Sequence, residues 1–263
     1  MTARRALVTG ASSGIGEAVT RLLASKGYRV ALLARRGEEL ERVLAELPGE
    51  GHLVLPCDLR DPVAIERAIE TLDTQFGGLD LLVNNAGVGY RARVEELDPE
   101  TLKRVFDTNV FALLLACQAA LPLLRRSERA VVVNVASVVG RRGIPGQAAY
   151  SASKAAACSI GEALRVEWAE DAIAVCTLNP ALTTTGFFEA QANPGDLPHP
   201  DLAEASPADE VARHVLALDQ RPEPERSLRW KWRLLGALSA IRPRLADRML
   251  VRRLGGGWRT PRW

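Results

Sequence analysis

The sequence predicts an α/β fold in which a doubly wound parallel sheet fills one domain, residues 1–225, and a basic helical tail follows, residues 226–263. Short apolar runs alternate with helical patterns over the first 180 residues, and the runs are almost unbroken Val, Leu, Ile and Ala. Such strands are typical of a parallel sheet that helices cover on both faces. A glycine-rich turn after the first run, and a chain that is 47% hydrophobic, agree with one large domain.

Six strands are expected in order along the chain, with helices between them. They occupy residues 6–8, 29–34, 52–57, 79–84, 130–135 and 172–178. Pro62 suits the first turn of the helix that follows the third strand. The pattern then changes to a loop over residues 182–205, which is followed by a helix over residues 206–218. Ser206 is expected to be the N-cap of that helix, with Pro207 in its first turn.

The turn between the first strand and the first helix indicates a nucleotide site. It reads Thr9-Gly10-Ala-Ser12-Ser13-Gly14-Ile15-Gly16. Glycines let the backbone approach a ligand closely, and a helix N-terminus directs N–H groups and the positive end of its dipole at a phosphate. A turn with three glycines also occurs without any nucleotide, so the motif alone leaves both interpretations open.

The end of the second strand favours NADP(H) over NAD(H) as the cofactor. An NAD site typically places an acidic side chain here to accept hydrogen bonds from the ribose hydroxyls. This chain has Ala34 instead, followed by Arg35 and Arg36, whose guanidinium groups suit a 2′-phosphate. The alternative is a helix that simply begins with two solvated arginines.

Tyr150 and Lys154 are four residues apart, so a helix places them one turn apart on one face. A nearby cation favours the phenolate and lowers the pKa of a tyrosine from its usual value of about 10, which makes the tyrosine more useful in proton transfer. Ser137 would donate to the same carbonyl oxygen if the fold brings it close. This set suits carbonyl reduction or alcohol oxidation, although the spacing also occurs on ordinary helices with a solvated lysine.

Together these residues resemble the short-chain dehydrogenase/reductase family over residues 5–185. The family's motifs occur in order, and they comprise the glycine turn, Asp58 with Leu59, the turn Asn84-Asn85-Ala86-Gly87, Asn109, and the set Ser137, Tyr150 and Lys154. The resemblance implies a Rossmann-type sheet, a nicotinamide cofactor and interconversion of a carbonyl and an alcohol. It also implies a homodimer or homotetramer. A non-catalytic NADP-sensing or scaffolding protein that kept the fold is the alternative.

The resemblance further implies roles for individual residues. Tyr150 is the implied general acid/base, Lys154 lowers its pKa and binds the nicotinamide ribose, Ser137 orients the carbonyl, and Asn109 holds a proton-relay water. The expected cofactor contacts are Thr9, Gly10, Ser12, Ser13, Gly14, Ile15, Gly16, Arg35, Arg36, Asp58, Leu59, Asn85, Ala86, Gly87, Tyr150, Lys154, Pro180 and Thr185. One departure is Ala181, which stands after Pro180 where the family usually has glycine.

The loop of residues 182–205 corresponds to the family's specificity loop and predicts an apolar or extended substrate. A 3-oxoacyl chain and a steroid-like or retinoid-like compound all remain open. The expected apolar walls are Val88, Tyr90, Val138, Val139, Ile144, Phe187, Phe188 and Leu197.

The tail of residues 226–263 differs from the body in charge. It holds eleven Lys or Arg residues and one acid, Asp247, for a net charge of +10, so the body carries −8 of the total of +2. Apolar residues recur at helical spacing beside arginines, and four of the five tryptophans lie here. We expect either helices folded over the substrate loop or a partner subunit, or a helix in peripheral contact with a membrane. Nucleic acid is disfavoured because no nucleic-acid fold is visible.

Cysteine and histidine spacing predicts no metal site, since Cys57, Cys117, Cys158, Cys176, His52, His199 and His214 are scattered. The thiols are expected to be buried and reduced, as in a cytoplasmic protein. No signal peptide is expected. The longest uncharged stretch, residues 110–124, is shorter than a membrane span, so no transmembrane helix is predicted.

Overall fold

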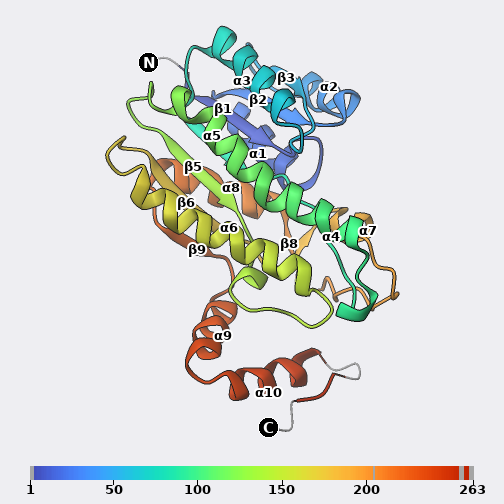
Figure 1. Ribbon diagram of the computed structural model, residues 1–263. Helices are drawn as coiled ribbons and strands as arrows, with labels where there is room; N and C mark the ends of the chain where they lie inside the picture. Colours follow the sequence, from blue (N-terminus) through green and yellow to red (C-terminus); the bar gives the residue numbers. More distant parts are fainter. Residues whose placement is uncertain (1–2, 204, 255–257, 261–263) are drawn as a thin grey trace.

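The computed structural model describes residues 3–203, 205–254 and 258–260. They form a seven-stranded parallel sheet with the strand order β3-β2-β1-β4-β5-β6-β9 (Figure 1). The strands are β1 (Arg5–Thr9), β2 (Arg29–Ala34), β3 (Leu53–Pro56), β4 (Leu81–Asn84), β5 (Val131–Val135), β6 (Ala174–Asn179) and β9 (Glu225–Ser227). The predicted doubly wound parallel sheet is confirmed.

Two layers of helices cover the sheet, which explains why its strands are apolar throughout. In β1, Ala6 and Val8 pack with the first layer, whereas Leu7 packs with the second. The first layer contains α1 (Gly14–Ser25), α2 (Gly37–Ala45) and α8 (Ala208–Gln220), and the second contains α3 (Pro62–Phe76), α5 (Ala112–Leu124) and α6 (Ala148–Glu167). The strand order reverses between β1 and β4, and sheets of this kind bind ligands at the carboxyl ends of the strands at that point.

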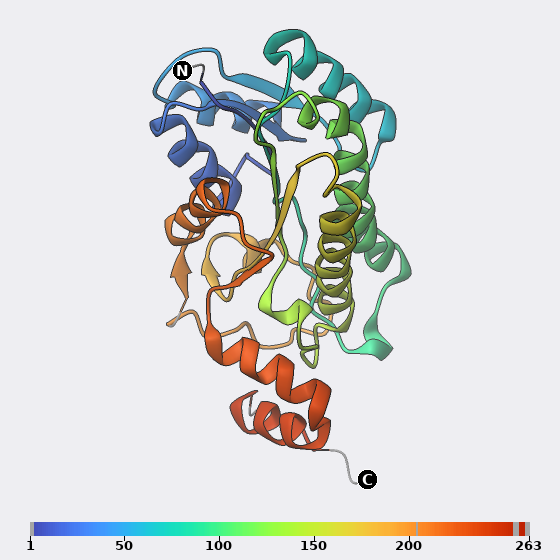
Figure 2. The same cartoon turned by 90° about the vertical axis from the view of Figure 1, so that its left-hand side faces the viewer.

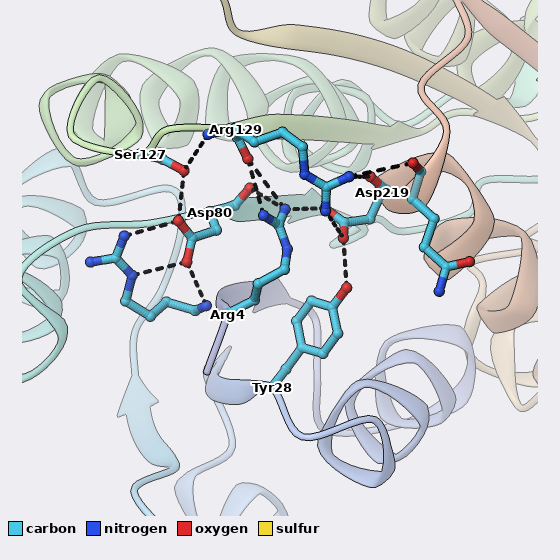
Figure 3. Close-up of polar contacts among 8 residues, drawn as sticks. Arg4, Tyr28, Asp80, Ser127, Arg129 and Asp219 are labelled. Carbon is cyan, nitrogen blue, oxygen red and sulfur yellow. Dashed lines mark hydrogen bonds and ion pairs between the residues drawn. The ribbon is translucent and has the colours of Figure 1, made fainter. Parts of the chain in front are cut away.

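Two buried carboxylates tie the opposite, amino-terminal ends of the strands together (Figure 3). Asp219 at the end of α8 is fully buried and receives Arg4 at 2.5 Å, the Tyr28 hydroxyl at 2.6 Å and Arg129 at 3.4 Å. Asp80, just before β4, receives Arg5 and Ser127. These contacts join the starts of β1, β4 and β5 to α8, at the end of the sheet away from the glycine turn.

The seventh strand, β9, was not predicted and crosses the expected domain boundary at residue 225. It begins at Glu225, immediately after Pro222 and Pro224. An edge strand needs partners on one side only, so the prolines are tolerated. The Thr177 N–H donates to the Pro224 carbonyl oxygen at 3.1 Å, and the Leu228 N–H donates to the Asn179 carbonyl oxygen at 3.2 Å.

The expected N-cap role of Ser206 is wrong. Ser206 and Pro207 form the short strand β8, which pairs with β7 (Thr183–Thr184), and α8 begins two residues after Ser206. The Ser206 hydroxyl instead accepts a hydrogen bond from Arg229 at 3.2 Å. Ser206 therefore pairs with a strand of the loop of residues 182–205 and does not cap α8.

Among the described residues, one helical run meets the length and hydropathy criteria for crossing a membrane. It spans 26 residues, through α4 (Pro99–Phe106), the π-helical turn η2 (Asp107–Phe111) and α5, and is longer than the uncharged stretch noted in the sequence. Half of its apolar window is buried inside the protein. Since α5 packs on the sheet, this run has the place of a core helix.

The tail forms a helical hairpin of α9 (Trp230–Ile241) and α10 (Pro243–Leu254), which lies beyond the carboxyl ends of the strands (Figures 1 and 2). An ion pair between Arg142 and Asp247 and a close approach of Gly236 to Arg141 hold it to the loop before α6. Part of the predicted tail, including Trp263, lies outside the described residues.

Candidate active site

A cavity of about 2340 Å³ opens at the carboxyl ends of the strands. The glycine turn and residues 34–36 and 57–60 line one end, and residues 85–88 line its middle. The other end is lined by the segment that begins at Ser137, by the loop of residues 180–203 and by the hairpin. Most of the predicted site residues therefore lie in one continuous cavity.

The glycine turn has the backbone geometry that a bound phosphate requires. Gly10 and Gly14 have φ angles of +67° and +57°, which disfavour any residue with a side chain. A Cβ atom on Gly16 would collide with the Gly10 carbonyl oxygen. Ser13 precedes α1 without making a side-chain cap hydrogen bond, so its side chain does not compete for the N–H groups of the first turn.

Thr9 joins this turn to the segment after β4. Its hydroxyl donates to the Val83 carbonyl oxygen at 3.2 Å and accepts from the N–H groups of Asn85 at 2.9 Å and Ala86 at 3.0 Å. The Asn85 amide in turn donates to the Thr9 carbonyl oxygen at 3.0 Å. The two strand ends that border the crevice are thereby fixed to each other.

The basic end of the cavity contains both predicted arginines, which are exposed. Arg36 crosses to the glycine turn and donates to the hydroxyls of Ser12 at 3.1 Å and Ser13 at 3.3 Å. Asp58 pairs with Arg60 at 2.6 Å. Hydrogen bonds from Arg60, together with the charge of Arg35, hold the pKa of Asp58 below its usual value. The residues present thus fit a nucleotide that carries an additional phosphate.

Tyr150 projects into the cavity from the start of α6. Burial raises its pKa above the usual value, and a hydrogen bond with the Ser137 side chain acts in the opposite direction. Its ring lies 5.6 Å from the ring of Phe187, which makes an edge contact with Phe188 at 5.5 Å. Burial therefore dominates the pKa of Tyr150 in this structure, in contrast to the lowering expected from a nearby lysine.

Lys154 is buried one turn further along α6. Its Nζ donates to the Val135 carbonyl oxygen at 2.9 Å and lies 6.0 Å from the centre of the Tyr150 ring. Burial lowers the pKa of Lys154 to about 8, and the nearby Cys158 acts to raise it. A Cβ atom on Gly87 would lie 3.3 Å from this Nζ.

Asn109 lies in the π-helical turn η2 and borders the cavity from behind. Its Oδ1 accepts from the Val88 N–H at 2.8 Å, and its Nδ2 donates to the Val88 carbonyl oxygen at 3.0 Å and to Ser153 at 2.9 Å. π-Turns inside helices often occur at functional sites. Here the turn holds the segment after Gly87 in place.

The end of β6 closes the site above the glycine turn. The Pro180 carbonyl oxygen accepts from the Val138 N–H at 3.0 Å. The Thr185 methyl group would lie 3.2 Å from a Cβ atom on Gly14, so the two predicted contacts face each other. Ala181, the departure from the family's usual glycine, lines the cavity.

Some predicted residues lie outside the cavity lining. Thr9, Gly16 and Asn109 act through neighbouring backbone, and Tyr90 is buried in a separate apolar cluster, where its hydroxyl accepts from the Asp98 N–H at 2.7 Å. The sequence did not single out Arg91, Arg93 or the individual tail residues that line the substrate end, although helices folded over the substrate loop were one of the two expectations for the tail. The lining residues from the hairpin and the chain next to it are Leu228, Arg229, Trp230, Lys231, Trp232, Leu234, Leu235, Leu238, Met249, Leu250, Arg253, Leu254 and Trp258.

The described residues contain no group of three or more His, Cys, Asp or Glu side chains that could hold a metal ion. The four cysteines are buried free thiols, as the sequence predicted.

Comparisons with known proteins agree with this geometry. A family model described as short chain dehydrogenase matches residues 4–194. The chain is 35% identical over 219 residues to carbonyl reductase family member 4 of Danio rerio, covering 83% of this chain and 92% of that protein. It is 34% identical over 258 residues to an uncharacterized oxidoreductase of Myxococcus xanthus, covering 97% and 98%. That second alignment is long enough to include most of the hairpin.

Two solved structures share the fold. A 3-ketoacyl-(acyl-carrier-protein) reductase from Brucella melitensis, complexed with NADH, has a TM-score of 0.77 at 26% identity, covering 86% of this chain and 96% of that chain. An alcohol dehydrogenase from Thermococcus sibiricus, complexed with 5-hydroxy-NADP, also has a TM-score of 0.77, at 28% identity, covering 87% and 97%.

Proposed function

The chain belongs to the short chain dehydrogenase family, and on that premise we propose that it is an NADP(H)-dependent oxidoreductase for an apolar carbonyl compound. The family makes it a nicotinamide-dependent oxidoreductase that acts on alcohol or carbonyl groups. The observation that carries the proposal is the convergence of Ser137, Tyr150 and Lys154 beside Gly87 in the cavity that contains the glycine turn.

In this proposal each site residue has one task. The bound nicotinamide would supply the hydride at its C4 position. Tyr150 gives its proton to the carbonyl oxygen, and Ser137 donates a hydrogen bond to the same atom. Lys154 turns from the Val135 carbonyl to the ribose hydroxyls, where its charge favours the phenolate left on Tyr150. Asn109 fixes the backbone of Val88 and holds a water that restores the proton.

The choice of NADP(H) rests on the exposed arginines at the end of β2. Arg36 already lies over Ser12 and Ser13, and Arg35 is close enough to affect the pKa of Asp58. A 2′-phosphate placed there would receive charge-assisted hydrogen bonds from guanidinium groups, whereas the site has no carboxylate at Ala34 to accept from ribose hydroxyls.

An apolar substrate is favoured by the cavity wall next to Tyr150. Phe187, Phe188 and Leu197 from the specificity loop, with Val138 and Ile144, line that side of the cavity. A 3-oxoacyl, steroid-like or retinoid-like compound fits this lining.

The function is tested by following NADPH oxidation, beside NADH, with aldehydes, 3-oxoacyl thioesters, steroids and retinal. Turnover of at least one apolar carbonyl compound, with a lower KM for NADPH, is expected. In the variant Arg35→Ala/Arg36→Ala we expect the KM for NADPH to rise about 10- to 100-fold and that for NADH to stay the same. Tight NADPH binding without turnover of any compound would favour the alternative, a non-catalytic NADP-sensing or scaffolding protein.

We also propose a homodimer or homotetramer in the cytoplasm. Phe111 on η2, Leu114 on α5 and Val166 on α6 are 55%, 39% and 75% exposed, and a second copy of the chain would cover such apolar side chains. Light scattering after size exclusion should give a multiple of 28.5 kDa. A monomer at micromolar concentration would contradict this.

For the hairpin we propose peripheral contact with an anionic membrane in addition to its place in the cavity wall. Leu235, Leu238 and Leu250 line the cavity. Trp230 also lines it but is 66% exposed, and Ile241, which is not among the lining residues, is 78% exposed beside Arg242. This pattern suits a helix at a lipid interface. Wild-type protein should sediment with vesicles containing phosphatidylserine, and Trp230→Ser/Ile241→Ser should not. Equal sedimentation of both proteins would contradict the contact.

A further inference from the structure

Arg91 is a cation in the cavity wall that the proposed chemistry does not use. Its side chain is partly buried, it lines the cavity, and its Nε has no hydrogen-bond partner and is fully shielded from solvent. No ion pair to Arg91 occurs among the described residues, and burial alone lowers its pKa. An Nε–H group that is shielded from solvent and has no acceptor is costly unless a ligand supplies one.

Gln191 provides a second unpaired donor next to Arg91. Its Nε2 is also shielded from solvent and has no hydrogen-bond partner. The Arg91 N–H donates to the Ala192 carbonyl oxygen at 2.9 Å, and Tyr90 and Ala192 form a parallel bridge. The two segments therefore lie side by side as a short ribbon.

The ribbon directs both donors to one face. Tyr90, Ala92 and Ala192 pack together in an apolar cluster on its other face. Because side chains alternate along an extended chain, Arg91 and Gln191 project to the opposite side.

Arg91 lines the cavity on that side, whereas Gln191 lies behind the lining residues, against Gly89. A Cβ atom on Gly89 would lie 2.9 Å from Gln191 and 3.0 Å from the ring of Phe187. Phe187 in turn packs against Tyr150 with ring centres 5.6 Å apart. Gln191 is thus separated from the Tyr150 ring by one aromatic side chain, that of Phe187.

The charge of the cavity wall here is positive. Its lining at this end includes Arg91, Arg93 and Lys231, whereas the acidic residues among the described part of the lining are Asp58, which Arg60 pairs, and the exposed Asp201. Arg93 already has a partner, since its guanidinium lies 4.6 Å from the Trp258 ring centre. An anion entering the cavity therefore meets Arg91 as a partly buried cation that has no ion pair among the described residues.

We propose that Arg91 and Gln191 form a subsite for an anionic group of the substrate, so that the substrate is an amphipathic anion with an apolar body and a terminal carboxylate or phosphate. This inference rests on the proposed function, since the carbonyl of the same molecule would lie at Tyr150. The guanidinium of Arg91 binds two anionic oxygens, and the Gln191 amide donates to one of them.

The test compares methyl ketones of increasing chain length that end in a carboxylate, a methyl ester or a phosphate. Wild-type protein should have a kcat/KM about 10- to 100-fold higher for an anionic ketone than for its ester, mainly through KM. Arg91→Met and Gln191→Met should reduce that ratio toward one, and Arg91→Lys should retain most of it. Whichever series of ketones, carboxylate or phosphate, has the higher kcat/KM identifies the kind of anionic group that the subsite binds.

Arg93→Met is the matched control, because it removes a cavity arginine that already has an aromatic partner, and it should keep the wild-type ratio. Equal kcat/KM for anions and esters in wild-type protein, or an unchanged ratio in Arg91→Met, would overturn the proposal. Thermal unfolding identifies any variant that does not fold, and in that case Arg91→Gln, which keeps a polar side chain, replaces it.

A binding measurement separates this inference from the proposed function. Calorimetry with dodecanoate and dodecyl phosphate, in the presence of NADP⁺, should show binding to wild-type protein that is about 10- to 100-fold weaker in Arg91→Met. Binding without turnover of any ketone would refute the carbonyl chemistry and keep the subsite. Turnover with no preference for anions would refute the subsite alone.

Discussion

The buried charge of Lys154 lowers the stability of the folded protein at a position that the proposed reaction uses. The folded protein holds its ammonium in a buried position, where a single carbonyl oxygen, that of Val135, accepts from it. Burial lowers its pKa from 10.5 to about 8. The charged form is therefore less favourable in the folded state than in the unfolded chain.

We predict that Lys154→Met stabilises the protein near pH 7 by about 2 kcal/mol, because the gain from removing a buried charge exceeds the loss of one hydrogen bond. Below pH 8 both states of the wild type are protonated, and the penalty is complete. Between pH 8 and 10.5 the unfolded state binds more protons, so wild-type stability rises with pH and the difference shrinks. Urea unfolding of both proteins at several pH values checks this, and a less stable variant at pH 7 would contradict it.

The spacing of Tyr150 and Lys154 could be predicted from the sequence because a helix converts four residues into one face. The effect of the environment on Tyr150 could not, since its pKa depends on burial by Phe187 from a distant loop. Arg91 could not be identified either. The alternation of Arg91 with Tyr90 and Ala92 is visible in the sequence. The bridge between Tyr90 and Ala192, which places Arg91 beside the loop, is a tertiary contact that the sequence does not reveal.

At the scale of elements, the hairpin of α9 and α10 changes the substrate end of the cavity. Its helical spacing and basic charge are evident in the sequence, and the two helices form where Pro243 separates them. Its position is not evident, because it depends on Asp247, the single acid of the tail, pairing with Arg142 in the loop before α6. The strand β9, which precedes the hairpin, was missed because two prolines immediately precede this short edge strand.

We predict that Asp247→Asn loosens α10. The pair with Arg142 is partly buried, and its loss should destabilise the local contact by about 1 kcal/mol. Hydrogen exchange should become about fivefold faster in residues 243–254. Asp171→Asn, which breaks the more exposed pair with Arg125, is the control and should leave exchange in α10 unchanged. Unchanged exchange in Asp247→Asn would show that other contacts fix the hairpin.

At the scale of the whole molecule, the candidate active site and the buried carboxylates that stabilise the fold lie at opposite ends of the strands. The cavity lies at the carboxyl ends of the strands, whereas Asp80 and Asp219 join their amino-terminal ends (Figure 3). The sheet class was predictable because apolar runs and a glycine turn are local patterns. The partners of Asp219 were not, since Arg4, Tyr28 and Arg129 are far from it in the sequence.

We predict that Asp219→Ala destabilises the protein by about 3 kcal/mol, because it leaves two arginines and a tyrosine hydroxyl without their buried acceptor. The activity at low temperature should remain close to that of wild type. Asp171→Ala removes an exposed partner instead and should cost less than about 1 kcal/mol. Denaturant unfolding measures both, and equal losses would contradict the assigned role of Asp219.

The central claim is that hydride is transferred to a carbonyl carbon while Tyr150 protonates its oxygen. The most direct measurement uses NADPH with deuterium at both C4 positions, an apolar ketone, and mass spectrometry of the product alcohol. We predict one deuterium on the carbinol carbon in wild-type protein and a rate reduced about 10²- to 10⁴-fold in Tyr150→Phe. Tyr90→Phe removes the same atom from a tyrosine outside the cavity and should stay near the wild-type rate. An alcohol without deuterium, or full activity in Tyr150→Phe, would contradict the claim.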